Sequence, residues 1–422
     1  MCLCFCKRLF TCLLLSICVG AVSIVAVYKI SPETVFFNIK PAEVIYEKSG
    51  DYPQWLPGNL TTQLDNFTDT LMLQNCIYSE NNAFEASFLN PRRIYTKDGQ
   101  VKNLLLQLQD ATGYVHTDYP IYWHGYIVVL KPLLYFLDVS DLCLFNAVLQ
   151  LVLAIYFLHC LNRKIGVFFA LSYLLVYLLL NPISLAMSFQ FSIMYYIMTI
   201  SSIFMIKNFK RLLERELYIT FFMVVGIITA YFDFLTYPLV SLSIPLVIFL
   251  VMLANIPNNL FFSSYSKVLL YTSYISLSWV CGYFCMFLGK WVLAWIITGN
   301  NIVNNGFARV LYRTSSGGDI TAVSAISNNL NVFMTSPLFD VLVICLLFLL
   351  CRVFVSMRRY HINKNILHLS FGVLIISVYP FIWYMILSNH SFIHAFFTYR
   401  ELSIFIFAFC CFVALIEKNK CK

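Results

Sequence analysis

YWHGYIVVLKPLLYFL, residues 122–137, is the stretch on which the topology of the whole chain depends. It is apolar, but it is shorter than the roughly 20 residues that a membrane-spanning helix needs. Lys131 and Pro132 also stand near its middle. Such a segment either crosses a membrane or lies along the membrane surface, and the rest of the sequence has to distinguish the two.

The composition indicates a membrane protein. Of the 422 residues, 60% are hydrophobic and only 11% are charged, and the mean hydropathy is +0.78. Soluble domains carry roughly 25% charged residues. The net charge of +8 is distributed in short runs between apolar segments, so no nucleic-acid partner is expected. We therefore expect an all-α polytopic membrane protein.

Ten apolar segments are long enough to span a bilayer. They cover residues 10–29, 142–161, 166–184, 185–206, 217–234, 236–254, 268–288, 337–355, 366–388 and 401–417. If residues 122–137 formed another span, the basic runs Arg163–Lys164 and Lys207–Arg215 would lie outside, against the positive-inside rule. If that stretch lies along the outer surface, every basic run lies inside. The second topology gives ten transmembrane helices with both termini in the cytoplasm.

Three parts follow from this topology. Residues 1–29 form a cytoplasmic N-terminus and a first transmembrane helix, which has no clear cleavage site. Residues 30–141 form an extracytoplasmic segment with juxtamembrane amphipathic helices. Residues 142–422 form a nine-helix membrane domain with an outer loop at about 289–336. The short, lysine-rich links suit a bacterial plasma membrane, which in a Gram-negative cell is the inner membrane.

Three acids are candidates for chemistry on the outer side. Asp65 and Asp69 are four residues apart in TTQLDNFTDTLMLQN, whose apolar residues recur at helical spacing, so both carboxylates share a helix face. The alternative is the solvated face of a surface helix. Asp233 lies in DFLTYP, which we interpret as a tight outer turn between two spans. This acid is therefore expected at the rim of the membrane and not at its centre, where a charge is costly.

Three cations are candidates for phosphate binding on the same side. Lys290 follows an apolar segment in GKWVLAWIITGNN, Arg313 follows it in a polar loop, and Arg400 opens the last span. Cations bind phosphate as point charges or as bidentate clamps. The alternative for Lys290 is a side chain that snorkels to the interface. The alternative for Arg400 is an ion pair with the neighbouring Glu401.

Histidines and aromatic residues complete this side. The stretch HTDYPIYWHGY is rich in aromatic residues, which suits a membrane interface, and it contains His116, Trp123 and His124. His390 and His394 are four residues apart in the last outer link. Two histidines are too few for a metal site, so we expect an interfacial pair and no metal centre. The sequence leaves open whether a divalent cation takes part in any reaction.

Several common sites are missing from the sequence. It contains no P-loop, no GxGxxG after a strand and no GxSxG, so nucleotide chemistry in the cytoplasm is unsupported. Most of the fifteen cysteines lie in apolar stretches, which argues against a disulfide framework. We interpret CLCFC at residues 2–6 as apolar filler or an acylation site.

Four stretches carry a family resemblance. They resemble stretches in bacterial membrane proteins linked with the synthesis of surface polysaccharides such as O-antigen or capsule. The four stretches are LDNFTDTLML, YWHGYIVVLKPLL, YFDFLTYPLVSLSIPL and GKWVLAWIITGNN. The arrangement as a whole resembles the GT-C class of integral-membrane glycosyltransferases. This resemblance implies an enzyme that moves a sugar from a polyprenyl-phosphate-linked donor, on the extracytoplasmic face, to a surface glycan or lipid-linked acceptor.

The resemblance also implies roles for residues. An acid in the first outer loop of this class acts as general base on the acceptor hydroxyl, and Asp69, or else Asp65, occupies that position. Many members carry paired acids directly after the first helix, where this chain has only Glu33 and Glu43. Asp233 would position the acceptor or serve as a second acid. The residues implied to bind phosphate, line the carrier groove or stack on a sugar are Lys290, Arg313, Arg400, His116, His124 and Trp123.

Other classes would require different patterns. A polysaccharide polymerase would carry its largest loop late in the chain, whereas here the largest loop is early. A transporter or flippase for lipid-linked glycans would place charges near the bilayer midplane and show internal repeats. An acyltransferase would favour His124 or His394 as its base. A purely structural membrane protein would leave the one-sided polarity unexplained.

Overall fold

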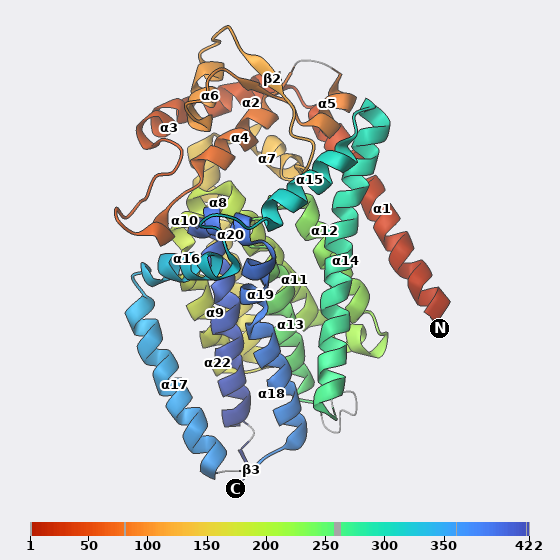
Figure 1. The fold of residues 1–422 in the computed structure, drawn as a ribbon, viewed down its shortest axis with the longest axis vertical. Helices are drawn as coiled ribbons and strands as arrows, with labels where there is room; N and C mark the ends of the chain where they lie inside the picture. Colours follow the sequence, from red (N-terminus) through yellow and green to blue (C-terminus); the bar gives the residue numbers. More distant parts are fainter. Residues whose placement is uncertain (1, 80–81, 257–262, 360, 419, 422) are drawn as a thin grey trace.

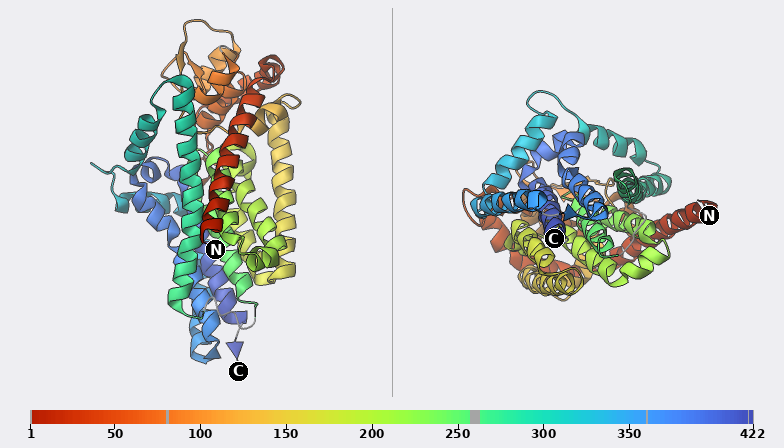
Figure 2. Two further views of the ribbon diagram at one scale, coloured as in Figure 1. Left: turned by 90° about the vertical axis from the view of Figure 1, so that its right-hand side faces the viewer. Right: turned by 90° about the horizontal axis from the view of Figure 1, so that it is seen from below.

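The chain folds into a bundle of long helices covered at one end by a layer of short elements (Figure 1). The computed structural model describes residues 2–79, 82–256, 263–359, 361–418 and 420–421. We call the long helices the bundle and the covering layer, residues 30–138, the cap. Both chain ends point away from the cap (Figures 1 and 2).

In the described residues, seven helical stretches are long and apolar enough to cross a membrane, which indicates a multi-pass membrane protein. The bundle consists of α1 (Cys2–Tyr28), α8 (Val139–Lys164), α9 (Val167–Leu179), α11 (Phe189–Glu214), α12 (Tyr218–Phe232), α13 (Leu239–Leu253), α14 (Tyr265–Thr298), α17 (Phe339–Arg359), α18 (Lys364–Ser377) and α22 (Leu402–Lys418). Three of the expected spans form the shorter helices α9, α12 and α13, of 13, 15 and 15 residues. They are about 20–23 Å long, less than the roughly 30 Å of a hydrocarbon core, so the count of ten spans stays a prediction.

The cap contains residues 122–137, the stretch whose placement decided between the two predicted topologies. Its elements are α2 (Pro32–Ile39), η1 (Lys40–Ala42), α3 (Glu43–Ser49), η2 (Leu60–Thr62), α4 (Asn66–Cys76), α5 (Ala83–Leu89), α6 (Gln100–Leu108), α7 (Ile127–Leu134) and the antiparallel pair β1 (Arg92–Ile94) and β2 (Val115–Thr117). α7 has eight residues and is about 12 Å long, too short to cross a bilayer by itself.

The expected outer loop at about 289–336 is largely helical. α14 continues to Thr298, and α15 (Ile302–Thr314) and α16 (Ala322–Met334) cross the bundle below the cap (Figure 1). The amphipathic sequences of α15 and α16 were missed because an apolar stripe on a short surface helix is weaker than that of a span. The remaining short elements are α10 (Pro182–Met187), α19 (Tyr379–Ile386), α20 (Ser388–Ile393), α21 (Ala395–Thr398), η4 (Tyr399–Glu401) and the pair β3 (His361–Ile362) and β4 (Lys420–Cys421).

The connections between bundle helices that carry Lys and Arg lie at the end of the bundle opposite the cap, where hydrogen bonds join several of them. Lys418 Nζ donates to the carbonyl of Ile165 (3.3 Å) and to Asn255 Oδ1 (3.1 Å). Arg8 Nη2 donates to the carbonyl of Glu216 (3.4 Å). The links after α8, α11 and α13 therefore share one end with the C-terminal helix, as charge sorting predicts. That this end faces the cytoplasm stays a prediction.

Close contacts between distant segments hold the bundle helices together and also join the bundle to the cap. Gly226 of α12 and Gly282 of α14 face each other's helix backbones, because a Cβ on either would lie 2.2 Å from the carbonyl oxygen of Trp279 or Met223. Small residues permit such close helix packing in membranes. At the cap, the Tyr399 hydroxyl donates to the carbonyl of Thr61 (3.0 Å).

Candidate functional site

A groove opens in the side of the bundle beneath α15. It has a volume of about 440 Å³ and lies between α14, α15, α19 and the turn that joins α12 to α13. Its walls are almost entirely apolar and aromatic. They include Leu235, Leu239, Trp279, Phe284, Phe287, Trp291, Ile382 and Trp383. Phe284 and Ile382 are also exposed, and both belong to helical stretches that are long and apolar enough to cross a membrane.

α15 brings two arginines to the polar end of this groove. Asn301 caps the helix by accepting the amide of Asn304 (3.0 Å). Gly306 lies against the Trp291 ring so closely that a Cβ there would be 2.5 Å from ring atoms. Arg309 and Arg313, four residues apart, therefore share the face that lines the groove. In the described part of the chain, neither forms an ion pair with a carboxylate.

Arg313 is held by a buried histidine. Its Nη1 donates to Nδ1 of His390, so the His390 proton is on Nε2, which donates to the carbonyl of Leu235 (2.7 Å). Burial and the Arg313 charge lower the pKa of His390 well below its ordinary value, which keeps the ring neutral. Leu235 has φ 67°, a conformation that costs free energy in a residue with a Cβ. The His390 bond stabilises this strained turn at the groove wall.

Two buried acids lie behind the groove wall. The Asp233 carboxylate accepts the amide of Thr236 (3.1 and 3.2 Å) and the Thr236 hydroxyl, so it closes its own turn. Glu401 Oε1 accepts the amide of Leu239 (3.0 Å), the first residue of α13. Glu401 Oε2 is buried and has no hydrogen-bond partner among the described residues. A buried oxygen without a partner is rare and requires an explanation.

Two polar atoms in the groove are without partners. Tyr283 lines the groove, and its hydroxyl is buried and has no hydrogen-bond partner in the described structure. The indole Nε1 of Trp383, another groove residue, is likewise buried without a partner there. The groove therefore combines apolar walls, two arginines and two polar atoms that can bond a ligand.

The predicted acids Asp65 and Asp69 lie elsewhere and are bonded to backbone. Asp65 caps α4, where it accepts the amide (3.0 Å) and hydroxyl (2.9 Å) of Thr68. Asp69 reaches across to α11 and accepts the amides of Phe189 and Gln190, both at 3.1 Å. Their exposed fractions are 2% and 1%, so the alternative of a solvated helix face is wrong.

Burial changes the ionisation of both carboxyls. It raises the pKa of Asp65 to about 6. Burial and the charge of Asp65 raise the pKa of Asp69 to about 8, while the amides of α11 act in the opposite direction. Both oxygens of Asp69 are engaged, so this carboxyl serves the N-terminus of α11.

Lys290 joins α14 to the cap. It is fully buried, which rules out snorkelling, and its Nζ donates to the carbonyl of Ser87 (3.3 Å) and to Asn90 Oδ1 (3.1 Å). The Nζ also lies 5.1 Å from the centre of the Phe88 ring and 5.8 Å from that of Trp123. Lys290 does not line the groove.

Arg400 is also buried away from the groove. Its Nε donates to the carbonyl of Leu180 (3.2 Å) and its Nη1 to that of Phe396 (3.2 Å), and the guanidinium lies 4.1 Å from the centre of the Phe191 ring. No ion pair with Glu401 forms in the described structure.

The predicted residues of the aromatic stretch do not line the groove. Trp123 is buried and donates to the carbonyl of Met286 (2.7 Å). His124 is buried and bonded to the carbonyl of Tyr119 (2.8 Å) and to the Tyr126 hydroxyl (3.0 Å). His116 lies on β2, with its ring against Tyr78 and Tyr114. Their neighbours Ile121 and Tyr122 are the residues that line the groove.

Of the predicted site residues, Arg313 therefore lines the groove, and Asp233 lies behind its wall. Sequence reasoning passed over Glu401, Tyr283 and Trp383 as site residues, and treated Arg309 as part of a loop. The spacing of Arg309 and Arg313 is a helical signal that could have placed both on one face. Tyr283 and Trp383 carry no sequence signal, because aromatic residues are common in spans.

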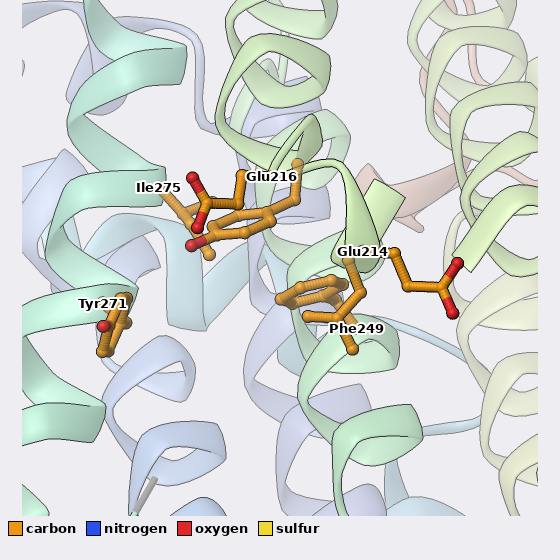
Figure 3. Close-up of a pocket in the computed structure, with 7 residues that line it drawn as sticks. Glu214, Glu216, Phe249, Tyr271 and Ile275 are labelled. Atoms are coloured by element: carbon orange, nitrogen blue, oxygen red, sulfur yellow. The ribbon is translucent and has the colours of Figure 1, made fainter. Parts of the chain in front are cut away.

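A second cavity lies at the opposite end of the bundle. It measures about 310 Å³ and is lined by Leu213, Glu214, Glu216, Tyr218, Phe249, Tyr271 and Ile275. Figure 3 shows the Glu214 carboxylate directed away from Phe249 and Tyr271. Both glutamates are exposed, and Glu214 forms an ion pair with Lys210, one turn earlier in α11 (3.7 Å). Among the described residues, no three potential ligands come together as a metal site would require.

Comparisons with protein-family models, curated proteins and solved structures gave no match for this chain. A functional assignment therefore depends on the geometry of the groove and on the resemblance in sequence.

Proposed function

We propose that the protein is a glycosyltransferase that moves a sugar from a polyprenyl-phosphate-linked donor to a surface glycan or a lipid-linked acceptor at the capped end of the bundle. The observation that carries this proposal is the groove with Arg309 and Arg313 at its polar end. A long hydrocarbon fits an apolar channel that opens toward lipid, and arginine is well suited to hold a phosphate beside it.

Glu401 is the best candidate for the general base. Each Asp69 oxygen already accepts an amide of α11, and Asp233 is bonded to Thr236, whereas Glu401 Oε2 has no partner in the described structure. An acceptor hydroxyl that enters beside Tyr283 would donate its proton to Oε2 and accept a hydrogen bond from the tyrosine. Asp233 would keep the turn and the groove wall in place.

The reaction then follows from these positions. The acceptor oxygen attacks the anomeric carbon of the donor sugar, and its proton passes to Glu401. The bond from that carbon to the phosphate oxygen breaks, and its electron pair leaves with the lipid phosphate. Arg309 and Arg313 stabilise the charge that develops on the leaving group. Trp383, with its free indole N–H, is placed to hold a sugar hydroxyl.

The test is sugar transfer by the full-length protein in lipid vesicles. Vesicles are loaded with radiolabelled polyprenyl-phosphate hexoses and acceptor lipids from a glycan-producing bacterium, and label that leaves the donor pool is measured. The wild type should transfer the sugar. Arg313→Gln should transfer it at least about tenfold more slowly, because it lacks a charge-assisted contact with phosphate. Equal transfer by both proteins, or release of label from neither, would overturn the proposal.

A polysaccharide polymerase would use the same groove with a longer donor glycan. The two functions differ in product. A transferase changes the mass of the acceptor by one sugar, whereas a polymerase lengthens a ladder of repeats, and electrophoresis of the products separates them.

A further inference from the structure

Three arginines lie in or next to the groove. Arg309 and Arg313 line it from α15, and Arg92, on β1 in the cap, is connected to its wall through two tyrosine rings. The Arg92 guanidinium lies 5.7 Å from the centre of the Tyr119 ring, and Tyr119 packs on Tyr122, a groove residue, with ring centres 5.5 Å apart. Two parts of the chain that are far apart in sequence thus supply one basic mouth.

The charges of all three arginines act on the Tyr119 hydroxyl. Burial raises the pKa of its hydroxyl, and Arg313, Arg309 and Arg92 each act in the opposite direction. No tyrosinate is needed for this conclusion, because the same three charges would act on any anion in that position.

The three guanidinium groups have unused donors. Arg92 Nη1 donates to Gln100 Oε1 (3.1 Å), but its Nε is buried without a partner among the described residues. Arg313 donates to His390, and no hydrogen bond of Arg309 is found within the described chain. No carboxylate in that part of the structure forms an ion pair with any of the three. The mouth therefore offers about three positive charges for an anion.

We infer that the donor lipid carries a diphosphate and not a monophosphate. This inference rests on the proposed function and names its substrate class. Transfer of a sugar from a lipid monophosphate releases a product with about two negative charges, because the second ionisation of a phosphate monoester has a pKa near 6. Transfer from a lipid diphosphate releases about three. Three arginines match the second product, and their positions on two sides of the mouth suit two adjacent phosphates.

The test compares two short isoprenoid probes, farnesyl phosphate and farnesyl diphosphate. Their binding to the full-length protein in lipid nanodiscs is measured by displacement of a radiolabelled probe. The diphosphate should bind at least about tenfold more tightly. Arg92→Gln should reduce diphosphate binding about tenfold and leave monophosphate binding within about twofold. The matched control, Arg211→Gln, changes an exposed arginine at the opposite end and should alter neither.

Two results would overturn the inference. One is equal or tighter binding of the monophosphate by the wild type. The other is an Arg92→Gln protein that has the thermal stability of the wild type and an unchanged preference for diphosphate. If Arg92→Gln fails to fold, Arg309→Gln serves in its place, since Arg309 is exposed. The binding test does not depend on catalysis, so either of these results would overturn this inference and leave the proposed function to be decided by the sugar-transfer test.

Discussion

Asp69 and Glu401 are buried carboxylates in two regions of the molecule, and each caps the N-terminus of a bundle helix. They differ in how many of their oxygens accept a hydrogen bond. Each comes from a distant segment and accepts the first free amides of a bundle helix, Asp69 at α11 and Glu401 at α13. A helix N-terminus favours such an anion. Asp69 uses both oxygens, whereas Glu401 uses one, and its Oε2 is buried without a hydrogen-bond partner in the described structure. The comparison teaches that burial alone does not distinguish the two acids, whereas an unused oxygen does, and this difference is the basis on which we propose Glu401 as the base.

The largest expected effect is on catalysis at Glu401. Glu401→Gln keeps the oxygen that caps α13 and removes the proton acceptor, so the transfer rate should fall about 10²- to 10⁴-fold. Thermal stability should change little. Transfer rates per folded protein in lipid vesicles measure this. Asp69→Asn is the matched control and should retain most of its activity, and the reverse ranking of the two variants would refute the comparison.

The next effect is on stability at Asp69. Asp69→Ala leaves two buried amides of α11 without acceptors, which should cost about 2–4 kcal/mol. Glu401→Ala leaves one amide free and should cost roughly half as much. Thermal unfolding of both variants in the same detergent, followed by circular dichroism, compares the two losses of stability. A larger loss at Glu401 than at Asp69 would contradict the count of hydrogen bonds.

A smaller effect is expected where α15 lies on Trp291. Gly306→Ala adds a methyl group that conflicts with the indole ring, so α15 must move, at a cost of about 1–3 kcal/mol. Arg309 and Arg313 move with the helix, and probe binding should weaken while the cap is unaffected. Gly317→Ala is the control, because a Cβ there meets nothing within 4 Å. Equal binding by the two variants would show that α15 does not set the arginine positions.

The smallest effect per pH unit is a pH dependence of stability that belongs to Asp69. The pKa of this carboxyl is about 8 in the folded state, against an ordinary value of 3.8, so between these values the folded state binds more protons than the unfolded state. Stability should therefore fall as pH rises toward 8, by up to about 1.4 kcal/mol per unit, and level off above it. Asp69→Asn removes this slope. Melting temperatures of both proteins between pH 6 and 9 test it, and parallel curves would rule it out.

Local features were predictable from sequence, and long-range ones were not. The helix around Asp69 follows from the spacing of Leu64, Phe67 and Leu71, and α4 forms there. The role of Asp69 depends on amides 120 and 121 residues later, which no local pattern reveals. Arg400 and Glu401 are neighbours in sequence and looked like a pair, but successive side chains on a helical turn point in different directions, and each finds a separate partner.

The hydrogen bond between Tyr399 and Thr61 joins residues 338 positions apart. Thr61 is therefore synthesised long before Tyr399. Asp69 is likewise synthesised before the α11 amides that it accepts. This contact of the cap can form only after Tyr399 has been synthesised, even though the cap lies in the first third of the sequence. The last bond between the cap and the bundle is therefore made late in biosynthesis.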